Sequence, residues 1–228
     1  MAIVPIAGRV GSTWLGSDAV VLVGVLAIAR LTLAVASWDS GSGFALMASA
    51  RELMISVFGE ALLLLALLVA ALPAQSTNLT AMSAAAAGGH IWGGPAHWCG
   101  AIAFILVILV ETGRQPIDNP DTHLELTMIH EGPLLEYAGR DLAFLQWASA
   151  ARHWLVLILA AELFLPHWGG FAAGLGFTLA GVAALCCVLA LLETEQAKMR
   201  ILKVPALLGV GSAIALAGAG MWVGGVGV

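Results

Sequence analysis

Long apolar segments separated by short polar ones dominate the sequence, and this pattern predicts helices that cross a membrane. A bilayer-spanning α-helix needs roughly 20 apolar residues, and a chain with several such segments folds as a helix bundle because lipid offers backbone groups no hydrogen-bond partners. We therefore expect an all-α, polytopic transmembrane helix bundle that forms a single membrane domain over residues 1–228. Its six expected spans lie at about residues 18–38, 49–72, 97–112, 143–165, 171–192 and 204–227.

The composition supports a membrane protein and excludes several other classes. Hydrophobic residues make up 61% of the chain and charged residues only 10%, too few polar groups to cover a soluble domain of this length. The net charge is −5 and no basic block is present, so we set nucleic-acid binding aside. The cysteines Cys99, Cys186 and Cys187 form no CxxC pair, and we expect them to be small buried apolar side chains rather than ligands of zinc or an iron–sulfur cluster.

Basic residues predict the orientation of the bundle. They gather near the first, third and fifth connections between spans, where the sequence contains Arg51, Arg114, Arg140, Lys198, Arg200 and Lys203. The opposite side contains Arg9. Because cytoplasmic connections are enriched in Lys and Arg, we expect these three connections in the cytoplasm and both termini outside it.

Ionisable residues inside the expected spans are the first candidates for function. A charge at bilayer depth costs about 3 kcal/mol, so such residues face a partner or a water-filled path. An interhelical salt bridge, for example between Arg30 and Glu60, is the structural alternative to ion conduction. We expect Glu162, close to a span end, to be solvated. The intramembrane polar path that we expect comprises Arg30, Arg51, Glu52, Glu60, Glu111 and Glu193.

The third connection, residues 113–142, is the most charged part of the chain and is expected to be a cytoplasmic or interfacial loop. Asn119-Pro120 is a good helix start and Gly132-Pro133 a helix breaker, so we expect two short helices there. His123 and His130 are seven residues apart, which places them on one helix face and suits a proton relay more than a metal site, since no HExxH motif is present. We expect the other histidines at the membrane interface. The residues alone fit proton movement, coupling to a cytoplasmic partner, or a transporter.

The third connection also resembles a known family. Residues 114–126, RQPIDNPDTHLEL, followed by Glu136-Tyr137-Ala138-Gly139, are similar to the signature of the subunit 1 family of respiratory complex I. In that family the loop joins the membrane arm to the hydrophilic arm and helps to shape the quinone cavity. The stretch from Thr122 to Glu131 is typical of a branch of that family, the membrane subunits of energy-converting [NiFe] hydrogenases such as formate hydrogenlyase and hydrogenase 4. Segments 49–53 and 193–200 resemble the same branch.

The resemblance implies a function and a set of partners. The family usually has eight spans, so the chain resembles it without the first two helices, which weakens the expectation of a quinone site. We expect a membrane anchor and ion-coupling subunit in a prokaryotic inner membrane, without a catalytic residue, metal or redox centre of its own. The [NiFe] centre and iron–sulfur clusters would belong to hydrogenase-like large and small subunits, with antiporter-like membrane subunits alongside. The residues expected at the partner junction are Arg114, Asp118, Asp121, His123, Glu125, His130, Glu131 and Glu136.

Three other functions remain open at this point. The chain could serve as subunit 1 of a quinone-reducing complex I, which would make electron transfer quinone-dependent. A stand-alone secondary transporter would work without redox partners. A non-coupling scaffold would hold partner subunits at the membrane without moving ions.

Overall fold

The computed structural model describes residues 18–118, 129–167, 171–196, 199 and 201–225, and these residues form helices and connecting segments without a β-strand. Within the described residues, three short 3-10 turns lie between the helices: η2 (His90–Gly93), η3 (Gly132–Leu134) and η4 (Ile201–Lys203). The α-helices are α1 (Ala19–Asp39), α2 (Gly43–Ala74), α3 (Leu79–Ala87), α4 (Pro95–Thr112), α5 (Gly139–Phe164), α6 (Phe171–Glu195) and α7 (Val204–Val223).

Six of these helices, all except α3, are long and apolar enough to cross a membrane. The prediction of a polytopic helix bundle is therefore confirmed. The third expected span, at 97–112, corresponds to α4, which begins at Pro95 after a separate 3-10 turn. Proline suits the first helical position, where no backbone N–H is needed, and Gly94 before it is extended. The short helix α3 was not predicted.

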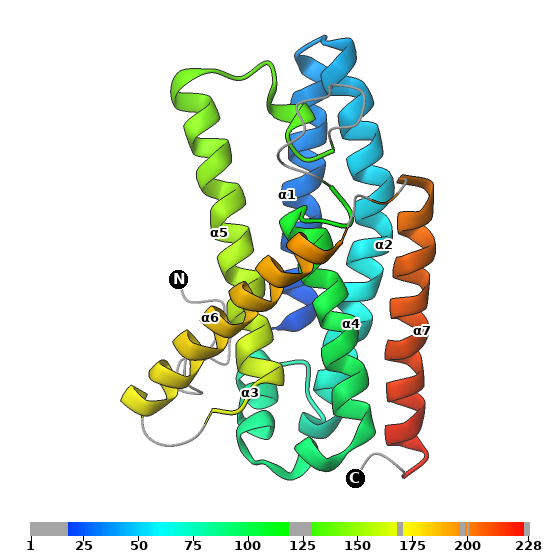
Figure 1. Cartoon of the computed structure of the whole chain (residues 1–228), viewed down its shortest axis with the longest axis vertical. Helices are drawn as coiled ribbons and strands as arrows, with labels where there is room; N and C mark the ends of the chain where they lie inside the picture. The colour runs from blue at the N-terminus through cyan, green and yellow to red at the C-terminus, as the bar shows by residue number, and fades with distance from the viewer. Residues whose placement is uncertain (1–17, 119–128, 168–170, 197–198, 200, 226–228) are drawn as a thin grey trace.

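The helices alternate in direction, so the connections fall at two ends of the bundle (Figure 1). The α1–α2 connection and the described residues between α4 and α5 lie at one end, which we call the loop end. Helix α3 and the η2 turn lie at the other, the α3 end. Helices α2, α4 and α7 pack closely together, α1 packs on α2, and α6 crosses the bundle obliquely beside α5.

Small residues allow the central helices to approach one another closely. A Cβ atom at Gly218 of α7 would lie 2.8 Å from Cβ of Cys99 and 3.2 Å from the carbonyl oxygen of Ala96, both on α4. Close backbone approach of this kind is the usual basis of helix packing in lipid, where burial of apolar surface gives little driving force. The expectation of three buried cysteines is wrong, because Cys99 is only half-buried and Cys186 and Cys187 are exposed on α6, where the helix presents its apolar side chains outward.

Candidate functional site

Three helices bring one arginine and two carboxylates together inside the bundle. Arg30 on α1 forms an ion pair with Glu111 on α4 through Nη2, and its Nε lies 3.9 Å from Oε1 of Glu60 on α2. The side chains of Arg30 and Glu111 are 5% and 0% exposed, and that of Glu60 is 23% exposed. Sequence reasoning offered Glu60 as the salt-bridge partner of Arg30, whereas the structure gives Glu111 the closer contact. With water excluded, each of these charges depends on its neighbours for stabilisation.

Gly59 determines how closely the two carboxylates approach. A Cβ atom at Gly59 would lie 2.8 Å from Cγ1 of Val110 and 4.0 Å from Nη1 of Arg30. Helices α2 and α4 therefore make their tight contact directly beside the ion pair. Glu60 and Glu111 are the next residues on the two helices, so this backbone contact sets their separation.

A second arginine at this site escaped sequence reasoning. Arg152 on α5 lies within electrostatic range of Glu111, Glu52 and Arg30. Its Nε and Oε2 of Glu111 are both buried and lack a hydrogen-bond partner within the described part of the chain. One feature of the sequence could have drawn attention to Arg152: its helix, α5, has the lowest hydropathy among the candidate membrane helices. We call Arg30, Glu52, Glu60, Glu111 and Arg152 the charge cluster.

The other two residues of the expected polar path, Arg51 and Glu193, lie outside the charge cluster. Arg51 is half-buried and directly precedes Glu52, which is 8% exposed. Glu193 pairs with Arg114 at 3.0 Å, and these side chains are 25% and 45% exposed. The structure thus places Glu193 in a partly exposed ion pair that links the start of the loop to the end of α6, rather than beside Arg30.

A cavity of about 670 Å³ opens at the loop end, between the end of α4, the segment that follows it and the first half of α5. Its wall includes Thr112, directly after Glu111, and His153, directly after Arg152. The cavity therefore reaches the loop-side edge of the charge cluster. Its polar lining includes Arg114, Asp118, His130, Glu131, Gln146 and His153.

Asp118 ties the two described ends of the loop together. Its Oδ2 atom accepts hydrogen bonds from the backbone N–H groups of Ile129 at 3.1 Å and His130 at 3.2 Å. Gly113, which ends α4 with φ +61°, makes room for this arrangement, because a Cβ atom there would lie 2.9 Å from the His130 ring. A residue of the RQPID motif thus fixes a cavity wall through backbone contacts.

The other predicted junction residues fall into two groups. Asp121, His123 and Glu125 lie outside the described residues, as does the expected helix start at Asn119-Pro120. Glu131 is exposed and lines the cavity, whereas Glu136 is exposed on the loop beyond the lining. Gly132-Pro133, expected to break a helix, begins the η3 turn.

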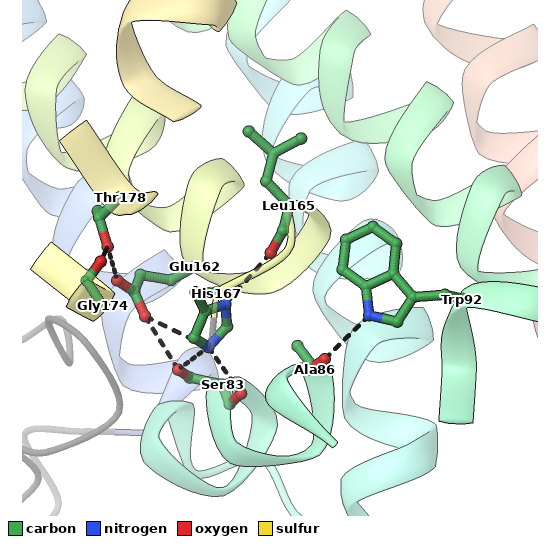
Figure 2. Close-up of polar contacts among 8 residues, drawn as sticks. All are labelled: Ser83, Ala86, Trp92, Glu162, Leu165, His167, Gly174 and Thr178. Carbon is green, nitrogen blue, oxygen red and sulfur yellow. Dashed lines mark hydrogen bonds and ion pairs between the residues drawn. The ribbon is translucent and has the colours of Figure 1, made fainter. Parts of the chain in front are cut away.

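A second polar cluster lies at the α3 end, where Ser83, Glu162, His167 and Thr178 meet (Figure 2). The expectation that Glu162 is solvated is wrong, since the residue is 1% exposed. The expected interfacial positions of His97 and His167 need the same correction, because they are 7% and 5% exposed inside the protein. Their partners come from other helices, which no local pattern in the sequence reveals.

Comparison with known proteins identifies the family. The family model described as NADH dehydrogenase matches residues 1–223. The chain belongs to this family. It is a multi-pass membrane protein with relatives in multi-subunit oxidoreductase complexes.

Three relatives show where in the family the similarity is strong. Formate hydrogenlyase subunit 4 of Escherichia coli is 33% identical over 202 residues, which cover 81% of this chain and 61% of the relative. Hydrogenase-4 component C of the same organism is 36% identical over 157 residues, which cover 66% of this chain and 47% of that relative. An NADH-quinone oxidoreductase subunit of Chlorobaculum parvum is 29% identical over 168 residues, which cover 69% of this chain and 46% of that relative. The resemblance expected from the loop motif is thus confirmed, and the chain spans about half of the length of these relatives.

Proposed function

We propose that this chain is the membrane anchor and ion-coupling subunit of an energy-converting hydrogenase-type complex similar to formate hydrogenlyase. The observation that carries the proposal is the buried charge cluster, whose Glu111 and Arg152 directly precede two residues that line the polar cavity at the loop end. Similarity to formate hydrogenlyase subunit 4 and hydrogenase-4 component C supports the hydrogenase branch. We place the protein in a prokaryotic inner membrane, with the loop end in the cytoplasm and both termini outside it, on the strength of the basic residues at the loop end.

The loop end would dock the partner subunits. Hydrogenase-like large and small subunits would carry the [NiFe] centre and the iron–sulfur clusters, and antiporter-like membrane subunits would lie alongside. The candidate contacts are the exposed loop residues Glu131 and Glu136, together with Arg114 at the cavity. The candidate residues Asp121, His123 and Glu125 belong to the same proposed junction.

The charge cluster provides a physical means of coupling. Arg30 lies between Glu111 and Glu60, so it can stabilise either carboxylate while the other takes up a proton. A change of charge in a docked partner would alter the electrostatic potential at the cavity. Because the dielectric constant inside the bundle is low, this change would reach the charge cluster with little screening. Redistribution of protons between the two carboxylates would then follow the redox state of the partner.

Replacement of Glu60 tests coupling against a scaffold role. Glu60→Gln keeps the side-chain shape but cannot hold an ionised carboxylate, so a coupling subunit should keep hydrogen turnover and lose the ion gradient in membrane vesicles. Glu195→Gln, at an exposed carboxylate that ends α6, is the matched control. Retention of both turnover and gradient in Glu60→Gln would favour a scaffold and contradict the proposal.

The cavity favours a second candidate, a quinone-reducing complex. Apolar side chains of Leu134, Leu135 and Leu142 line the cavity beside its polar groups, and a subunit of NADH-quinone oxidoreductase is among the relatives. Purification of the tagged chain in mild detergent separates the candidates. A nickel-containing subunit with hydrogen-dependent viologen reduction supports the hydrogenase branch, flavin- and NADH-linked subunits support the quinone reductase, and elution alone supports a stand-alone transporter.

A further inference from the structure

Four polar side chains from three helices and a connection meet at the α3 end (Figure 2). Glu162 of α5 accepts hydrogen bonds from Oγ of Ser83 at 3.0 Å and from Oγ1 of Thr178 at 2.6 Å. His167, which follows α5, places Nε2 3.3 Å from Oγ of Ser83 and 3.8 Å from Oε2 of Glu162. The side chains of Glu162 and His167 are 0% and 5% exposed. Glu162 is about 15 Å along α5 from Arg152, at ~1.5 Å per residue, so this cluster is separate from the charge cluster.

The surroundings of His167 can accommodate a proton on each ring nitrogen. Nδ1 lies 3.2 Å from the carbonyl oxygen of Leu165, and Nε2 lies 3.2 Å from the carbonyl oxygen of Ser83. A carbonyl oxygen only accepts hydrogen bonds, and a neutral imidazole has a single N–H. The imidazolium form satisfies both contacts, and the ionised carboxylate of Glu162 balances its charge, as a buried charge requires.

The same atomic positions suit a second arrangement of the proton. Nε2 can give its proton to Oγ of Ser83 while Ser83 gives its own hydroxyl proton to Oε2 of Glu162. His167 is then neutral and Glu162 is a carboxylic acid, with no change in the number of protons or in total charge. The Ser83 hydroxyl now donates to the bare Nε2 atom across the same 3.3 Å contact.

Thr178 suits both arrangements as well. Its single hydroxyl proton has two acceptors, Oε1 of Glu162 at 2.6 Å and the carbonyl oxygen of Gly174 at 3.0 Å. It can donate to Glu162 when that carboxylate is ionised and to Gly174 when it is protonated. The cluster thus accommodates two proton positions without movement of its heavy atoms.

We propose that Ser83, Glu162, His167 and Thr178 form a buried proton-binding site, in which Glu162 and His167 share one proton through the Ser83 hydroxyl. The site lies at the end of the bundle opposite the loop cavity, where a proton entering or leaving the membrane domain at the α3 end would bind. This inference goes beyond the proposed function, and it can be tested without any partner subunit.

A proton fits this site better than a sodium ion. The imidazolium already neutralises Glu162, so a metal cation would add an uncompensated charge to a site from which water is excluded. Helix α3, which carries Ser83, has no titratable side chain, and the ring of His97 on α4 lies 5.7 Å from that of Phe164 on α5. The other titratable groups on the helices packed around the site are Arg51, Glu52 and Glu60 of α2, Cys99 and Glu111 of α4, Arg140, Asp141, Arg152 and His153 of α5, and Cys186, Cys187, Glu193 and Glu195 of α6.

Nuclear magnetic resonance of the histidine rings tests the proposal. The full chain is labelled with nitrogen-15 histidine in lipid nanodiscs, and the His167 signals are assigned by their loss in His167→Gln. Because the shared proton depends on the carboxylate, Glu162→Gln should lower the imidazolium fraction of His167 by about tenfold or more near neutral pH. Glu195→Gln should leave it unchanged. A His167 ring with the same protonation in wild type and Glu162→Gln, from about pH 5 to 9, would overturn the proposal.

A milder variant keeps the test decisive if Glu162→Gln does not fold. Thr178→Val removes one donor to the ionised carboxylate, so it should move the proton toward Glu162 and lower the imidazolium fraction several-fold. Thr194→Val is the matched control, because Thr194 is also on α6 and donates to a carbonyl of its own helix. Unchanged His167 protonation in Thr178→Val would refute the shared proton. Exchange of potassium for sodium at constant pH should have no effect, and a sodium-dependent His167 signal that Glu162→Gln abolishes would identify a sodium site instead.

Discussion

Arg30 and Glu111 are 81 residues apart in the sequence and form an ion pair between α1 and α4, with side chains that are 5% and 0% exposed. Glu111→Gln should lower the free energy of unfolding by about 3–5 kcal/mol, because among the described residues Arg30 then keeps only the more distant Glu60 as an ion-pair partner. Unfolding in detergent micelles measures the loss. The double variant Arg30→Met with Glu111→Leu should recover part of it, since the buried Arg30 charge is removed, although Glu60 then loses Arg30 and Arg152 loses Glu111. A double variant as unstable as Glu111→Gln would contradict this account.

Gly59→Ala should destabilise the contact between α2 and α4. The added methyl group would lie 2.8 Å from Cγ1 of Val110, and overpacking of this kind costs about 1–3 kcal/mol. Gly24→Ala is the control, because a Cβ atom at Gly24 of α1 meets no atom within 4 Å among the described residues. Thermal unfolding compares the two variants. Combining Gly59→Ala with Val110→Ala should restore stability, and a failure to do so would show that the clash lies elsewhere.

Asp118→Ala should loosen the cavity wall without unfolding the bundle. Its carboxylate accepts the backbone N–H groups of Ile129 and His130, and hydrogen bonds to a charged group contribute about 1.5–3 kcal/mol. Hydrogen–deuterium exchange should therefore accelerate at these two amides, while those in the middle of α4 keep their protection. Arg114→Ala provides a comparison, because its partly exposed pair with Glu193 contributes less than about 1 kcal/mol. Equal effects of the two variants at residues 129 and 130 would show that Asp118 has no special role.

Asp121→Ala and Glu136→Ala should weaken partner docking or coupling and leave the helix bundle folded. Glu136 is exposed and lies outside the cavity lining, so its loss removes no internal contact that the bundle needs. Co-purification of partner subunits and the ion gradient in vesicles are the two measurements, and circular dichroism checks the fold. Unchanged partner retention together with unchanged coupling would remove these residues from the proposed junction.

The number and approximate positions of the long helices followed from the sequence, because both depend on local composition, although α2 extends beyond the expected 49–72 at both ends. The apolar run of α7 begins at Val204, as expected, and the RQPID motif located the loop that carries Asp118. The motif also identified the family, because a short pattern of charged residues and proline distinguishes one family from another better than the uniformly apolar spans do. The start of α4 at Pro95 lies within two residues of the expected span at 97–112.

Six apolar helices that cross the membrane, and the ionisable residues within them, could be predicted from the sequence alone. Which of these residues meet depends on the packing of the helices: Arg30 with Glu111, Arg152 near Glu111, and Glu162 with His167. Membrane helices are apolar on every side, so periodicity does not reveal which face of a helix packs inward. Close contacts at small residues such as Gly59 fix the rotation of each helix, and those contacts arise between segments far apart in the chain.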